Sequence, residues 1–267
     1  MVPRVPAILL IFGLLWLPPA GATDAAKEKR WADQIVDALI DGEAVWLEAG
    51  GHRFLGIWTE AETGKVEGGV ILVHGMGVHP DWPDVIHPLR VALPQHGWAT
   101  LSIQMPVLPN EAKVEDYAPV WKEVAPRLKA AVAFLRKQNI ENIAVVAHSL
   151  GASMAASFLA AQPRSGVAAF VAIGMTDITA TPEMSSARAL EKIRIPVLDL
   201  YGGNDLDAVR KSAPARAAAA RRAGNDKYAQ RRVPGADHFF AGMEETLVRQ
   251  VRTWLKANAP GVLKKKG

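Results

Sequence analysis

The chain has 267 residues, 49% of them hydrophobic and 22% charged, which excludes a mainly disordered or collagen-like protein and fits one domain or a small pair. There is no cysteine, which excludes disulfides, a thiol nucleophile and a thiolate metal site. Four of the 31 basic residues are Arg4 and the lysines at 264–266, and the other 27 are balanced by 27 acidic residues. A nucleic-acid surface is therefore not expected, and the solvated lysine tail would contact anionic lipid at most peripherally.

The first 22 residues have the three parts of a secretory signal peptide. Arg4 is the positive start, an uncharged apolar run follows over residues 7–17, and Ala20-Gly21-Ala22 has the A-x-A form of a cleavage site. The apolar run is shorter than the ~20 residues that a membrane-spanning helix needs. We therefore predict cleavage after Ala22, a mature chain that starts at Thr23, and a periplasmic or secreted location. The alternative is an uncleaved membrane anchor.

After this segment, the pattern of apolar residues changes from helical to strand-like and then alternates. Residues 25–41 are predicted to form an amphipathic helix, and the two segments that flank Gly50-Gly51 a hairpin. The hairpin strands are predicted at 44–48 and 54–60, later strands at 69–73, 98–103, 143–147, 167–173, 195–201 and 228–233, and later helices at 115–138, 149–161, 207–223 and 243–257. Pro126 is expected to kink or divide one of these helices, and Pro214 to interrupt another.

This order of elements predicts an α/β fold. Strands that alternate with helices form a mostly parallel sheet with helices on both faces, and the opening hairpin becomes its antiparallel edge. No linker or shift in composition divides residues 23–267, which predicts a single domain with a basic C-terminal tail. The segment 176–191 is too short for a large cap domain, so we expect a minimal lid and an open site.

The pentapeptide Ala147-His148-Ser149-Leu150-Gly151 lies between a predicted strand and a predicted helix. It resembles the G-x-S-x-G nucleophile elbow, with alanine in place of the first glycine. Small residues are needed there because the turn is tight and holds the serine in a strained conformation, beside free N–H groups at the start of a helix. The strand–turn–helix context makes Ser149 the predicted nucleophile.

Two further residues complete a predicted triad. His238 lies in a turn between the last strand and the last helix and is the predicted base, and Asp205 follows the strand 195–201 and is the predicted acid. Asp205 also fits a helix N-cap, and both roles are compatible. The order Ser149, Asp205, His238 is the nucleophile–acid–base order of the α/β-hydrolases. Each residue follows a predicted strand at one edge of the sheet, where open parallel sheets bind ligands.

Several neighbouring residues leave alternatives open. Asp177 is the rival acid, whereas Asp199, inside a strand, is predicted to be a buried structural group. Trp82 either lines the mouth of a substrate pocket or belongs, with Asp81, to a loop held by prolines. His148 packs either beside the substrate pocket or against the sheet. The histidines of residues 74–87 lack the carboxylate pattern of a familiar zinc site, so no metal is predicted.

His74-Gly75-Met76-Gly77 follows the strand 69–73 and resembles the H-G-x-G loop of the α/β-hydrolase fold. By that resemblance, the backbone N–H groups of Met76 and Leu150 form an oxyanion hole. The side chain of His74 is predicted to brace the loop.

Across nearly all of its predicted mature length, the chain resembles an α/β-hydrolase. More narrowly, HGMGVHPDWPDVIHPLR (74–90) and LPQHGWATLSIQMP (93–106) resemble an exported proteobacterial α/β-hydrolase-like family of unknown function, which implies no established substrate. The predicted activity is cleavage of a carboxylic ester or related acyl compound, either a small molecule or lipid-like, through an acyl-serine and without a cofactor. The alternatives are an amidase or peptidase with the same triad, and a non-catalytic envelope or binding protein that kept the fold.

Overall fold

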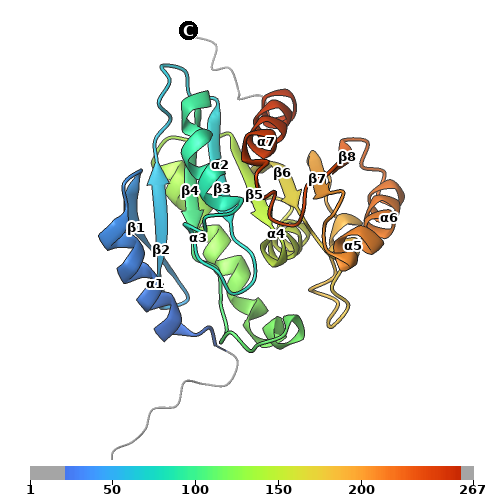
Figure 1. The fold of residues 1–267 in the computed structure, drawn as a ribbon, viewed down its shortest axis with the longest axis horizontal. Coiled ribbons are helices and arrows are strands. Elements are labelled where there is room, and N and C mark those ends of the chain that lie inside the picture. Colours follow the sequence, from blue (N-terminus) through green and yellow to red (C-terminus); the bar gives the residue numbers. More distant parts are fainter. Residues whose placement is uncertain (1–21, 260–267) are drawn as a thin grey trace, which may run out of the picture.

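The computed structural model describes residues 22–259, so that residues 1–21 of the predicted signal peptide and the lysine tail lie outside the described part. Its centre is an eight-stranded sheet with the order β1-β2-β4-β3-β5-β6-β7-β8 (Figure 1). β1 (Glu43–Ala49) pairs antiparallel with β2 (His52–Thr59), and β2 pairs antiparallel with β4 (Trp98–Ile103). The other neighbouring strands are parallel, which confirms the predicted sheet and its antiparallel edge.

The inner strands are buried on both faces, and their sequences are accordingly mostly apolar. Every residue of β3, β4 and β5 is buried. The remaining strands are β3 (Gly68–Val73), β5 (Ile143–His148), β6 (Val167–Ile173), β7 (Val197–Gly202) and β8 (Tyr228–Val233).

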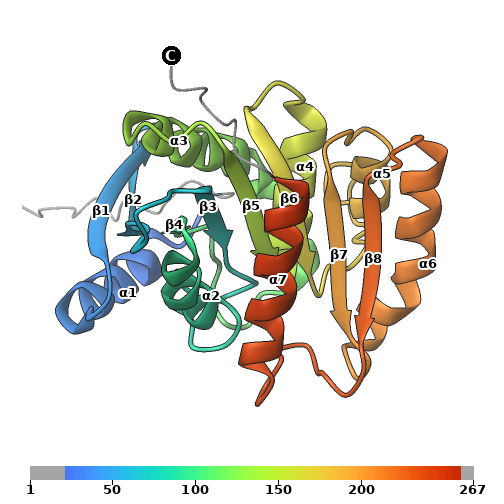
Figure 2. The same cartoon turned by 90° about the horizontal axis from the view of Figure 1, so that it is seen from above.

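Helices cover both faces of the sheet, as predicted. One face packs against α1 (Ala25–Ala38), α2 (Ile86–Ala92) and α7 (Glu244–Asn258). The opposite face packs against α3 (Val124–Lys137), α4 (Leu150–Ala161), α5 (Ser186–Leu190) and α6 (Asp207–Arg222). In Figure 2, α7 crosses in front of the sheet and α4 and α5 lie behind it. Within residues 22–259, no helix has the length and apolar character that a membrane crossing requires.

The segment predicted as one helix over 115–138 consists of two different helices. A 3-10 helix, η2 (Val114–Glu123), is followed directly by α3. The change occurs before Pro126, which lies in the first turn of α3, where an N–H group has no intrahelical acceptor and a proline is therefore tolerated. Another short 3-10 helix, η1 (Pro94–His96), precedes β4.

The predicted interruption at Pro214 is wrong, because α6 continues through this residue. A proline inside a helix removes one backbone hydrogen bond and can cost ~3 kcal/mol. Here the preceding turn has other hydrogen bonds: Ser212 Oγ donates to the Ala208 carbonyl at 2.6 Å, and Arg216 Nη1 donates to the Val209 carbonyl at 3.1 Å. The buried Arg216 also pairs with β7 and so holds α6 against the sheet.

Candidate active site

The turn between β5 and α4 holds Ser149 in an uncommon backbone conformation. Its φ is 54° and its ψ is −125°, a strained combination for a residue with a side chain. The Ser149 N–H donates to the Ile173 carbonyl of β6 at 2.8 Å. A Cβ on Gly151 would lie 2.1 Å from the His74 carbonyl oxygen, so only glycine permits this close approach of α4 to the loop after β3. The local pattern thus has the geometry of a nucleophile elbow.

Three residues that lie far apart in the sequence meet at the edge that Ser149 occupies. His238 Nε2 lies 3.0 Å from Ser149 Oγ, and His238 Nδ1 lies 2.6 Å from Asp205 Oδ1. With an ionised Asp205, the imidazole Nδ1–H donates to the carboxylate, and Nε2 is free to accept the serine proton. These residues follow β5, β7 and β8, whose carboxyl ends lie at one edge of the parallel sheet.

The Asp205 carboxylate is buried but well supplied with donors. Burial by itself would raise the pKa of Asp205, but the hydrogen bond and charge of His238, with two backbone N–H groups, hold this pKa below its ordinary value. Gly202 N–H donates to Oδ2 at 3.1 Å and Leu206 N–H donates to Oδ1 at 2.8 Å. Asp205 is therefore ionised at neutral pH. It is not the N-cap of α6, as the alternative predicted, because Leu206 occupies that position.

His148 lies directly behind His238. Its ring is only 3% exposed, its centroid is 4.8 Å from that of His238, and its Nε2 lies 3.0 Å from the His238 carbonyl oxygen. Burial, with a smaller effect of the nearby His238, lowers the pKa of His148 to about 3, so the neutral ring donates its Nε2–H to this carbonyl. The predicted contact of His148 with substrate stays a prediction. In the structure, the ring contacts both the backbone and the imidazole of His238.

The loop after β3 passes close to the nucleophile. A Cβ on Gly75 would lie 3.2 Å from Ser149 Cβ, so the backbone that leads into Met76 is beside this serine. Leu150 begins α4, where N–H groups have no acceptor within the helix. The two predicted oxyanion donors therefore belong to the two segments that adjoin Ser149.

His74 braces this loop from within the core. Its Nδ1 donates to the Gly75 carbonyl at 2.8 Å, and its Nε2 accepts the Met105 N–H at 2.9 Å and an N–H of the Gln104 amide at 3.0 Å. Burial lowers the pKa of His74 to about 3, so the ring stays neutral in this arrangement. Sequence reasoning missed Gln104, whose only signal is that it directly follows an apolar strand.

The other candidate acids have partners elsewhere. Asp177 accepts hydrogen bonds from residues at the start of α5. Asp199 is fully buried and paired with Arg216, which confirms its predicted structural character. Neither of them is a hydrogen-bond partner of His238, whereas Asp205 is.

The loop that follows the predicted oxyanion segment is held by its own contacts. Trp82 packs edge-on against His79 with 5.3 Å between ring centroids, and His79 packs in the same way against Trp31 of α1 at 5.4 Å. Asp81 forms an ion pair with the buried Arg90 of α2. These contacts favour the interpretation of a braced loop, and a role of Trp82 in substrate binding stays a prediction. Among residues 22–259 no group of His, Asp or Glu side chains is arranged to hold a metal.

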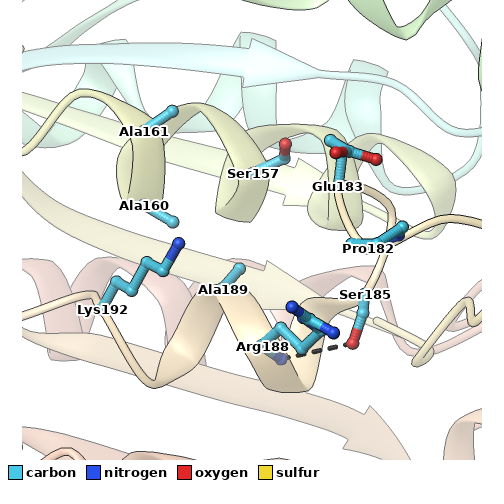
Figure 3. Close-up of a pocket in the computed structure, with 9 residues that line it drawn as sticks. All are labelled: Ser157, Ala160, Ala161, Pro182, Glu183, Ser185, Arg188, Ala189 and Lys192. Carbon is cyan, nitrogen blue, oxygen red and sulfur yellow. Dashed lines mark hydrogen bonds between the residues drawn. The ribbon is translucent and has the colours of Figure 1, made fainter.

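A separate surface cavity of about 240 Å³ lies between α4 and α5 (Figure 3). Its walls include Ser157 of α4 and Arg188 of α5, with Glu183 on the loop before α5. The cavity lies beside the predicted minimal lid, but none of the predicted site residues lines it.

Comparison with known proteins identifies a matching family and solved structures with a similar fold. Residues 18–120 and 115–257 match the family described as "Protein of unknown function (DUF3530)", and no curated protein matches the sequence. Est1E from Butyrivibrio proteoclasticus with ferulic acid bound is 16% identical, with a TM-score of 0.66 over 80% of this chain and 99% of that chain.

Two further solved structures have the same architecture. An esterase from Pyrococcus furiosus is 16% identical, with a TM-score of 0.65 over 84% of this chain and 94% of that chain. A dienelactone hydrolase from Anabaena variabilis is 23% identical, with a TM-score of 0.58 over 81% of this chain and 97% of that chain. These similarities show that the chain has the α/β-hydrolase fold.

Proposed function

Because the chain belongs to the family described as "Protein of unknown function (DUF3530)" and has the α/β-hydrolase fold, we propose that it is a serine hydrolase that cleaves a carboxylic ester or a related acyl compound. The observation that carries this proposal is the continuous chain of hydrogen bonds from Ser149 through His238 to Asp205, with distances of 3.0 and 2.6 Å. The names of the similar structures, esterases and dienelactone hydrolases, agree with ester chemistry.

In the proposed reaction, His238 Nε2 takes the proton of Ser149 Oγ as this oxygen attacks the acyl carbon. The negative charge moves to the carbonyl oxygen, which accepts hydrogen bonds from the N–H groups of Met76 and Leu150. The imidazolium, stabilised by Asp205, then protonates the leaving alcohol, and an acyl-serine remains. Water activated by His238 hydrolyses this acyl-serine to release the acid and restore the enzyme.

The surface around the serine favours an acyl group with apolar character. Phe239 is 42% exposed, and its ring centroid is 5.1 Å from that of His238. Met76, which adjoins the proposed oxyanion hole, is 43% exposed. Large apolar side chains beside polar reactive groups are typical of sites that bind the apolar part of a ligand.

Labelling with a fluorophosphonate tests the nucleophile. We expect the mature protein and the control variant Ser165→Ala to be labelled, and Ser149→Ala to remain unlabelled while folded. Absence of labelling in the folded parent, or equal labelling of Ser149→Ala, would contradict the proposal. A series of nitrophenyl esters of increasing acyl length then measures the size of the acyl site, and Phe239→Ala should weaken the binding of long acyl chains most.

We also propose that the protein is exported and cleaved after Ala22. The proposal is supported by the charged start, the apolar run and the A-x-A site of the sequence. Mass spectrometry of the periplasmic or secreted protein should find Thr23 at the N-terminus. Recovery of a chain that still begins with Met1 would contradict it.

A further inference from the structure

A largely buried charged cluster holds the segment that follows the proposed cleavage site. Arg127 of α3 is 1% exposed, and its Nη2 lies 2.9 Å from Glu28 Oε1 of α1 and 3.0 Å from Glu123 Oε2 at the end of η2. Glu28 and Thr23 are also buried, at 5% and 7% exposure. We call Thr23, Glu28, Glu123 and Arg127 the N-terminal cluster.

Thr23 is an integral part of this cluster. Its backbone nitrogen lies 3.0 Å from Glu123 Oε1, and its hydroxyl donates to Glu28. The same hydroxyl lies 3.0 Å from the Val107 carbonyl oxygen and accepts the Val107 N–H at 2.8 Å. The backbone nitrogen of Thr23 is thus held against a carboxylate, while its side chain is fixed by the loop after β4.

The charges of the N-terminal cluster do not balance while the nitrogen of Thr23 belongs to a peptide bond. Burial by itself would raise the pKa of Glu28, but a hydrogen bond from His52 and the charge and hydrogen bond of Arg127 hold this pKa below its ordinary value. Glu28 and Glu123 then share one guanidinium. Lys27 donates to other groups, the Leu108 carbonyl and the Asn110 side chain. Within the N-terminal cluster, two carboxylates therefore face one guanidinium, and incomplete pairing is unfavourable for the buried Glu28 and for Glu123, whose side chain is only 21% exposed.

We propose that Glu123 and Glu28 form a docking site for the α-ammonium group of Thr23, which a signal peptidase creates by removing residues 1–22. This inference rests on the cleavage after Ala22 proposed above. Hydrolysis of the Ala22–Thr23 bond consumes one water and leaves a carboxylate on Ala22 and an amine on Thr23, which takes up a proton at neutral pH. The new group brings the missing positive charge and two additional N–H donors beside Glu123.

The docking site also adjoins the support of the candidate active site. Arg127 Nη1 donates to the Gln104 carbonyl at 3.1 Å. The Gln104 side chain and the Met105 N–H bind His74, the residue that braces the oxyanion loop. Docking of the new N-terminus therefore stabilises a loop on which the geometry around Ser149 depends.

Chains with different N-termini test the proposal without the need for export. The described helices and strands lie within residues 25–258, so chains that start at Thr23 or Ala20 contain all of them. Each is released from an N-terminal fusion by a protease that leaves no extra residues. We expect the Thr23 chain to have a Tm higher by roughly 3–8 °C at pH 7 than the Ala20 chain. In Glu123→Gln this difference should vanish, whereas in Glu48→Gln, at an exposed position of β1, it should persist.

A chemical readout keeps the test decisive if Glu123→Gln fails to fold. Selective acetylation of the α-amino group of the unfolded Thr23 chain, followed by refolding, should lower its Tm to that of the Ala20 chain. In the folded parent, the docked group should react with an acylating reagent several-fold more slowly than the α-amino group of the Ala20 chain. Equal Tm values of the two chains, or a difference that survives in Glu123→Gln, would overturn the proposal. Because Tm is measured without substrate, this failure is distinct from a failure of the hydrolase proposal.

Discussion

Two buried aspartates, one within β7 and one in the turn after it, differ in their hydrogen-bond partners. Asp199, within β7, is bound by Arg216, Tyr228 and Gln230. Asp205, in the turn after β7, is bound by His238, which contacts Ser149 in turn. The guanidinium and two further donors hold the Asp199 side chain in one position, whereas a histidine can exchange a proton with its other neighbour. The partner of a buried carboxylate therefore decides whether it is structural or suited to chemistry.

The largest expected effect is that of Asp205→Asn on ester hydrolysis. The amide would favour the wrong imidazole tautomer, and we expect kcat to fall by roughly 10⁴-fold. The Tm should change far less than the rate. Steady-state kinetics and thermal unfolding of the same preparation measure both quantities. A variant that retains most of its activity would remove Asp205 from the proposed mechanism.

Asp199→Asn should show the reverse behaviour. It leaves the fully buried Arg216 guanidinium without its carboxylate, and loss of one partner of a buried ion pair typically costs about 3–5 kcal/mol. We expect the free energy of unfolding in urea to fall by this amount, with kcat per folded molecule close to that of the parent. If this variant lost activity while its stability stayed unchanged, the contrast between the two aspartates would be wrong.

Unlike the two aspartates, His148 is a buried titratable group without an ionic partner. The unfolded imidazole takes up a proton below a pKa of about 6.5, whereas the folded ring does so only near pH 3. The unfolded state therefore binds more protons between these values, and His148 lowers stability as the pH falls, by about 2 kcal/mol at pH 5. His148→Asn should flatten the acid limb of a plot of unfolding free energy against pH. The exposed His96→Asn is the control, and equal curves for His148→Asn and the parent would contradict this prediction.

The smallest expected effect is that of Tyr228→Phe. The Tyr228 hydroxyl donates to Asp199 Oδ2 at 2.7 Å, and burial together with the Asp199 charge raises its pKa, so that it remains a donor. Removing one of several donors to Asp199 should lower the free energy of unfolding by about 1.5 kcal/mol and leave kcat unchanged. Urea denaturation measures this loss. A loss as large as that of Asp199→Asn would mean that the donors do not act independently.

Much of the fold could be predicted because its signals are local. The apolar run of β6 predicted its bounds, since a strand covered on both faces favours apolar residues at successive positions. The continuity of α6 through Pro214 could not be predicted in this way. In the structure, the turn before this proline accepts a hydrogen bond from Arg216, which is itself paired with Asp199 of β7.

The candidate site also has some features that the local sequence predicts and others that only the fold explains. The small residues around Ser149 indicated a tight elbow, because the need for space in a turn is a local property of the chain. Asp205 was already the predicted acid, and the order of strands explains why it lies beside His238 and Asp177 does not. β8 pairs with β7, and a Cβ on Gly202 would lie 2.3 Å from the Ala236 carbonyl oxygen, so the turn that carries His238 lies directly against the turn of Asp205.

By itself, therefore, the sequence determined the alternation of strands and helices, the elbow at Ser149 and the order of the candidate residues, all of which follow from spacing along the chain. Only the tertiary structure decided which charged groups meet. His238 and Asp205 are 33 positions apart in the sequence, and Glu28 and Arg127 are 99 positions apart. The hydrogen bond from the Thr23 nitrogen to Glu123 spans 100 positions. Such contacts arise from sheet order and helix packing, because a buried charge takes the partner that the fold brings within reach.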